Sequence, residues 1–331
     1  MNIASSVTKT TDENVETAVI SHTVHGYTTD LTEAVSEVQS KVVTVNAFTE
    51  DKNISMSGII YSSSSNGTYI VTSSSSLNEE EAITVRFDNN ISLMATIVGT
   101  DTETDCAVLL VNPDFDAEAV TLGDSDILKT GEYIFSLSGR EEGTDAGIAS
   151  FGVVSSTAQT QTKSGTHISE VLVSDITLSD ISNGAPIFNI NGDMVGMLTT
   201  ELSSSNNKLA TAISVNELKL VVDEIISTDT VERGYLGIIG RNISDIQSYE
   251  KSFYSLQLDI TSGVLVTRVL ENSPAINAGI QTNDVIVGIG ETEIKDLKSL
   301  RECLYKLNTG DTVTVTINRQ GNLVTLTVVL E

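Results

Sequence analysis

Tryptophan is absent from this sequence of 331 residues, and proline, histidine and cysteine are rare, with three, three and two residues respectively. Cys106 and Cys303 lie far apart, so neither a disulfide framework nor a metal cluster is indicated. Both are expected to be small buried apolar residues. No group of residues has the spacing of metal ligands, and no motif indicates a cofactor. We therefore expect a protein that works without metal or cofactor.

Long apolar runs are also missing. No stretch of about 18 apolar residues occurs, which argues against a membrane-spanning helix. The N-terminus lacks the basic and then apolar layout of a signal peptide. Residues 1–30 are rich in Ser, Thr and acidic side chains, as is typical of a linker or loosely ordered arm. The chain is expected to be soluble as given, and the polar arm would also suit a stalk below a membrane anchor in a longer chain.

Acidic residues outnumber basic ones by 45 to 18, which gives a formal net charge of −27. Such a surface repels phosphate backbones and anionic lipids, so nucleic acid is not an expected partner. Basic or neutral polypeptides are easier partners. Because 40% of the residues are apolar, the chain has enough material for ordinary globular cores.

The length predicts two domains after the arm, over residues 31–227 and 228–331. Residues 31–38 have the apolar spacing of a short helix. From residue 41 to 173, short β-branched runs alternate with Asn, Asp, Gly and Ser turns, with almost no helix between them. This pattern predicts an antiparallel sandwich or a pair of barrels and excludes a parallel α/β sheet. A helix over 215–226 is expected to close the first domain.

The second domain has strand patterns at 263–267, 284–289, 312–317 and 323–328. Leu297, Leu300, Leu304 and Leu307 face one side of a helix predicted over 297–307. Together these patterns indicate a compact α+β domain.

Four segments of the first domain appear in a diagnostic order. They read T-Y-I-V-T-S-S-S-S-L at 68–77, V-G-T-D-T-E-T-D-C-A-V-L at 98–109, L-G-D-S-D at 122–126, and D-I-S-N-G-A-P-I-F-N followed by a hairpin at 180–196. This series resembles the protease domain of the HtrA family of trypsin-like serine proteases, over about residues 31–226. The resemblance implies a mainly β protein with a trypsin-like double six-stranded β-barrel, in which Ser75, Asp105 and Asn183 hold the positions of the catalytic His, Asp and Ser.

Acyl transfer by a Ser-His-Asp triad needs a nucleophile, a base with a pKa near neutrality and an acid that orients the base. Asn183 offers an amide instead of a hydroxyl, and Ser75 offers a hydroxyl instead of an imidazole. Ile181 also replaces a glycine of the family's oxyanion loop. These departures lead us to expect a pseudoenzyme without peptidase activity. The alternative is an active endopeptidase with an unconventional nucleophile such as Ser182, for which His167 is the one histidine within the domain.

The second domain resembles the PDZ domain that follows the protease in this family. The segment R-G-Y-L-G-I at 233–238 matches the carboxylate-binding loop, and S-P-A at 273–275 and D-V-I at 284–286 follow in the family's order. In such a loop, successive backbone N–H groups hold a C-terminal carboxylate while the neighbouring strand edge pairs with the peptide. The resemblance implies peptide binding by the following residues: Arg233, Gly234, Tyr235, Leu236, Gly237, Ile238, Leu300 and Leu304.

The sequence therefore predicts an inactive HtrA-like protein that binds polypeptide C-termini or unfolded segments through its PDZ domain. An adaptor, chaperone-like or regulatory role in protein quality control is expected, and a structural subunit of an active HtrA paralogue is a further alternative. The resemblance also implies a homo-trimer or a hetero-oligomer with such a paralogue, in a bacterial extracytoplasmic location at the cell surface or in the periplasm.

Overall fold

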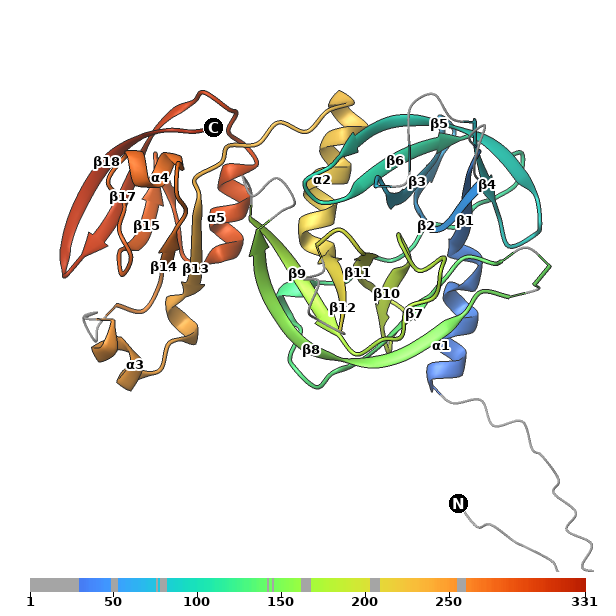
Figure 1. The fold of residues 1–331 in the computed structure, drawn as a ribbon, viewed down its shortest axis with the longest axis horizontal. Coiled ribbons are helices and arrows are strands. Elements are labelled where there is room, and N and C mark those ends of the chain that lie inside the picture. The colour runs from blue at the N-terminus through green and yellow to red at the C-terminus, as the bar shows by residue number, and fades with distance from the viewer. Residues whose placement is uncertain are drawn as a thin grey trace, which may run out of the picture.

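The computed structural model describes residues 30–48, 53–75, 77, 82–141, 143–144, 146–161, 168–202, 209–254 and 260–331. It is mainly β, with two closed barrels followed by a smaller α+β domain (Figure 1). The expected fold class is confirmed. None of the described helices is long and apolar enough to cross a membrane.

The first barrel is closed in the order β1-β2-β3-β6-β5-β4, with neighbouring strands antiparallel. Its strands are β1 Val42–Phe48, β2 Asn53–Ser64, β3 Gly67–Ser73, β4 Ala82–Arg86, β5 Ser92–Asp101 and β6 Cys106–Val111. Alternate residues such as Val43 and Val45 enclose one apolar core, as the period of two dictates.

The second barrel repeats this architecture in the order β10-β11-β12-β9-β8-β7. Its strands are β7 Tyr133–Leu137, β8 Ala149–Gln161, β9 Ile168–Ser174, β10 Pro186–Asn189, β11 Met194–Thr199 and β12 Ala210–Ser214. Buried residues such as Ile134 and Leu172 fill it. A third cluster, which includes Phe135 and Phe188, joins the two barrels to helices α1 Asp30–Val38 and α2 Val215–Thr228.

Helix α2 leads out of the barrels towards the second domain (Figure 1). Leu218, Val222 and Ile225 recur at helical spacing and are fully buried, which explains why this segment is helical and where it packs. Asp229 ends the helix in the left-handed conformation, with a φ of 65°. Because of this turn, the chain leaves α2 and enters the loop that precedes the second domain.

The second domain is an antiparallel sheet in the order β13-β14-β15-β17-β18, with the short β16 beside β15. Its strands are β13 Ile238–Asn242, β14 Val264–Val269, β15 Val285–Ile289, β16 Thr292–Glu293, β17 Thr312–Arg319 and β18 Asn322–Val329, and its helices are α3 Ser248–Phe253, α4 Pro274–Asn277 and α5 Leu297–Leu304. Strand β13 lies at the edge of the sheet. The expected helix over 297–307 ends three residues early, because Tyr305 takes the C-cap position. Helices α3 and α4 were not predicted.

Candidate functional site

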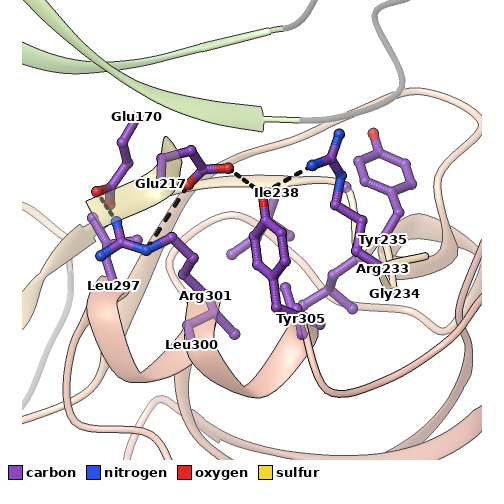
Figure 2. Close-up of a pocket in the computed structure, with 13 residues that line it drawn as sticks. Glu170, Glu217, Arg233, Gly234, Tyr235, Ile238, Leu297, Leu300, Arg301 and Tyr305 are labelled. Carbon is purple, nitrogen blue, oxygen red and sulfur yellow. Dashed lines mark hydrogen bonds and ion pairs between the residues drawn. The ribbon is translucent and has the colours of Figure 1, made fainter. Parts of the chain in front are cut away.

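A pocket of about 80 Å³ lies where the loop before β13 meets α5 (Figure 2). All eight residues that the sequence assigned to peptide binding line it. They are Arg233, Gly234, Tyr235, Leu236, Gly237, Ile238, Leu300 and Leu304. The remaining lining residues are Glu170, Glu217, Leu297, Arg301 and Tyr305. The structure therefore brings two segments that are about sixty residues apart into one site.

Close packing fixes the loop at Gly237. Its φ is +81°, which favours glycine, and a Cβ atom built there would lie 2.2 Å from Cβ of Ser273. The carbonyls of Leu236 and Gly237 accept hydrogen bonds from the N–H groups of Ala275 and Leu270, each at 2.9 Å. Within the described chain, the N–H groups of Leu236 and Gly237 donate no recorded hydrogen bond. The loop thus offers two adjacent donors beside an apolar pocket.

Arg233 faces the first domain rather than offering a free charge to a ligand. Its Nη2 atom donates to both carboxylate oxygens of Asp101, at 3.0 and 2.9 Å, and Nη1 donates to the Tyr305 hydroxyl at 2.9 Å. Burial opposes the charge, yet Tyr305, Asp101 and Glu217 raise the pKa of Arg233 above its ordinary value. The cation is therefore retained and neutralised within the protein.

The first domain supplies an acidic wall to the pocket. The Tyr305 hydroxyl donates to Oε1 of Glu217 at 2.6 Å, and Arg301 pairs with Glu170 (Figure 2). Arg301 also lies 3.3 Å from Asp126. Burial raises the pKa of Glu217 to about 7, against the lowering effects of Tyr305 and Arg233. Two basic side chains of the second domain are thus held by carboxylates of the first.

Sequence reasoning missed the four polar residues that complete the pocket lining, namely Glu170, Glu217, Arg301 and Tyr305. A signal existed for Glu217, because it precedes Val221 and Ile225 by four and eight residues on the apolar face of α2. An acidic residue in such a stripe indicates a buried carboxylate that needs a partner. The partner itself was not visible, since Tyr305 is 88 residues away.

A second cluster lies between the barrels, around Asp105. Its carboxylate accepts from the Ser75 N–H at 2.7 Å, from the Ser73 hydroxyl at 2.8 Å and from the Thr199 hydroxyl at 2.6 Å. Nδ2 of Asn183 donates to Ser73 Oγ at 2.7 Å and to Ser75 Oγ at 3.1 Å. The three positions that the family resemblance equates with a triad are therefore adjacent in space.

In this cluster the polar groups form a chain of hydrogen bonds. Asn183 contributes an amide donor, Ser75 a hydroxyl, and Asp105 a buried carboxylate that accepts every bond recorded for its side chain. Ser182, the alternative nucleophile, is also largely buried, and its hydroxyl accepts from the Ser179 N–H at 2.7 Å. All three histidines of the sequence, including His167, lie outside the described residues.

Comparison with known proteins gives a family match in each of the two domains. Residues 56–197 match the trypsin-like peptidase domain and residues 234–330 match the PDZ domain. The serine protease Do-like HtrA of Lactobacillus helveticus is 29% identical over 83% of this chain and 68% of its own length, and HtrB of Bacillus subtilis is 31% identical over 83% and 61%. The chain is HtrA-like, with a trypsin-like peptidase domain followed by a PDZ domain. It spans about two thirds of the length of these two relatives.

Solved structures agree with the HtrA assignment. The HtrA-type protease AlgW with a bound tripeptide is 25% identical, covers 90% of this chain and 95% of its own, and superposes with a TM-score of 0.62. A serine endoprotease from Yersinia pestis has the same fold, with a TM-score of 0.58 at 22% identity. The arrangement of two barrels and a PDZ domain is thus typical of HtrA proteins.

The prediction that this chain is not an enzyme is contradicted by these comparisons. Its HtrA relatives are named serine proteases and endoproteases, so the family points to an enzyme. The prediction relied on the side chains of Ser75 and Asn183, whereas the similarity to a named protease extends over 83% of the chain. It also relied on the absence of histidine at position 75, and His167, the alternative base, lies outside the described residues.

Proposed function

We propose that this HtrA-like chain acts in protein quality control by capturing polypeptides through their C-terminal carboxylates in the PDZ domain. The proposal rests on the N–H groups of Leu236 and Gly237, two residues that line the pocket, which donate no recorded hydrogen bond within the described residues. A carboxylate is the ligand that adjacent backbone donors bind best. The tripeptide and decapeptide complexes of AlgW show that peptides bind to HtrA-type proteases of this fold.

Apolar side chains define which C-terminal residue fits. Ile238 from the start of β13, together with Leu300 and Leu304 from α5, line the pocket, and its volume of about 80 Å³ is small. A small or medium aliphatic side chain at the peptide's C-terminus would fill this space. Because β13 is the last strand of its sheet, a peptide backbone would pair along its edge, as in strand addition.

Peptide titration of the full chain tests this function. A labelled peptide that ends in a free carboxylate and an aliphatic residue is expected to bind, and its C-terminally amidated form is expected to lose at least about tenfold in affinity. Gly237→Ala should abolish binding, because its Cβ would displace Ser273. Gly310→Ala is the matched control, since Gly310 has a φ of +91° but no atom within 4 Å of an added Cβ. Equal binding of the acid and the amide would refute carboxylate capture.

Oligomeric assembly and an extracytoplasmic location also belong to this proposal. Relatives that match 76–80% of this chain are named probable periplasmic DegP-like endoproteases, which supports the location. Native mass spectrometry of the purified chain tests the assembly, with a trimer as the expected species. A monomer at all concentrations would contradict this part of the proposal.

Peptide-bond hydrolysis is a second candidate activity, favoured by the serine protease names of the relatives. Digestion of unfolded casein and labelling by a fluorophosphonate test it on the full chain. The Ser75→Ala and Ser182→Ala variants identify which hydroxyl acts as the nucleophile. Ser75 lies in the Asp105 cluster and Ser182 in the neighbouring loop. Casein that stays intact, together with absent labelling, would overturn the candidate.

A further inference from the structure

A groove of about 1230 Å³ lies between the two domains, next to the peptide pocket. One wall consists of residues 239–242 of β13 and 296–298 at the start of α5. The opposite wall comes from the first domain, with residues 125–129 and 170–172. Glu170 and Leu297 line both the pocket and the groove, so the two spaces are adjacent.

The direction of a bound chain follows from the edge strand. A peptide that adds to β13 with its carboxylate at residues 234–237 runs antiparallel to the strand, so its upstream residues pass towards Asn242. Strand β13 has five residues, and each residue of an extended chain advances about 3.4 Å. The residues about three to five positions before the C-terminus therefore lie beside 240–242, within the groove.

The walls of the groove carry an excess of negative charge. Five acidic residues and three basic residues line it, an excess of two negative charges. They are Asp126, Glu132, Glu170, Asp245 and Asp296 against Lys129, Arg241 and Lys298. In the described part of the chain, ion pairs engage Asp126 with Lys298 and Glu170 with Arg301. Three lining carboxylates, those of Glu132, Asp245 and Asp296, have no recorded ion pair.

We propose that the groove between the domains receives the segment upstream of a captured C-terminus and selects a basic side chain about three to five residues before the end. This inference rests on the proposed carboxylate capture and adds a specificity that the pocket alone does not have. Its chemical basis is complementarity between an extended basic segment and a groove whose first-domain wall carries three acidic residues against one basic residue. The first domain thereby takes part in choosing the ligand of the second.

Matched peptides test the inference on the full chain. Three peptides share their last three residues and a free carboxylate, and differ by Lys, Ala or Glu at the fourth and fifth positions from the end. Fluorescence anisotropy is expected to give the Lys peptide about fivefold higher affinity than the Glu peptide at low ionic strength, and the ratio should shrink as salt is added. The Ala peptide should lie between them.

Charge-neutralising variants test whether the carboxylates of the groove cause the preference for the Lys peptide. Glu132→Gln with Asp245→Asn should bring the Lys and Glu peptides close to equal affinity, because both carboxylates line the groove and are exposed. Asp114→Asn with Asp116→Asn changes the net charge by the same amount at exposed residues that do not line the groove, and should leave the ratio unchanged. An effect of equal size in both double variants would overturn the inference.

The two proposals fail in different ways. If amidation abolishes binding while the Lys and Glu peptides bind equally, carboxylate capture holds and the groove inference is wrong. If the amidated and free peptides bind equally well, carboxylate capture is wrong, and the groove inference, which depends on it, is wrong with it.

Discussion

Nη2 of Arg233 holds both carboxylate oxygens of Asp101, at 3.0 and 2.9 Å, although 132 residues separate the two in sequence. Asp101 is the last residue of β5 in the first barrel, while Arg233 begins the loop that lines the PDZ pocket. Both side chains are more than nine-tenths buried. The PDZ pocket is thus connected to the first barrel by a largely buried ion pair.

Removing either partner of this ion pair is expected to lower the free energy of unfolding. Asp101→Leu leaves the guanidinium of Arg233 buried without its carboxylate, and should lower the free energy of unfolding by about 3 kcal/mol. Arg233→Met should cost a similar amount. The double variant should recover most of the loss, because two apolar side chains of similar volume need no charge partner. Urea unfolding of the four proteins gives the coupling free energy.

An exposed ion pair provides the control. Lys219 and Asp223 pair one helical turn apart on α2, with about half of each side chain exposed to solvent. Lys219→Ala should therefore change the free energy of unfolding by less than about 0.5 kcal/mol. If the Asp101→Leu loss is no larger than this, the interdomain pair does not stabilise the fold.

Glu217 is expected to make stability depend on pH near neutrality. Burial raises its pKa from 4.5 to about 7, so the folded protein binds this proton more tightly than the unfolded chain does. The contribution is fully present below pH 4.5 and is lost as the pH rises through about 7. Between about pH 5 and pH 7.5 the loss should be roughly 2 kcal/mol.

Glu217→Gln isolates this effect, because glutamine keeps an oxygen that can accept the bond from Tyr305 but does not titrate. The difference in unfolding free energy between pH 5 and pH 7.5 should shrink by roughly 2 kcal/mol relative to the parent protein. The neighbouring Asp101, Asp126, Arg233 and Arg301 remain in both proteins, so the comparison reports on the Glu217 side chain. Identical pH profiles would show that Glu217 does not bind a proton in this range.

Local patterns were enough to predict the architecture. Strands such as β3 and β6 are short apolar runs between turn residues, and the closure of six of them into a barrel leaves no exposed edges. The sequence also located the loop that lines the pocket, because residues 233–238 are contiguous and the positive φ of Gly237 favours glycine. Helix α4 was missed, since it has only four residues and no apolar periodicity to detect.

The contacts across the domain boundary were not predictable in the same way. Asp101, Glu170 and Glu217 come from β5, β9 and α2, and each meets its partner in the second domain only through the relative placement of the two domains. Hydrophobic periodicity carries no information on that placement. A buried acid in an apolar stripe signals that some partner exists, but its identity is a property of the assembled fold.

The Asp105 cluster provides the last prediction. This buried carboxylate joins the end of β3, the start of β6 and the end of β11, through Ser73, Ser75 and Thr199, so it ties the two barrels together. Asp105→Ala removes every acceptor at once and places alanine at a φ of 55°, so the free energy of unfolding should fall by at least about 3 kcal/mol.

Two milder variants separate the causes of that loss. Asp105→Asn tolerates the left-handed backbone and keeps one acceptor oxygen, so its loss should be about half as large. Thr199→Val removes one donor to Asp105 and the acceptor of the Glu201 N–H. It should cost about 1 kcal/mol, because Ser73 and the Ser75 N–H still satisfy the carboxylate. Urea unfolding ranks the three variants. An Asp105→Ala protein as stable as Thr199→Val would mean that the carboxylate does not hold the barrels together.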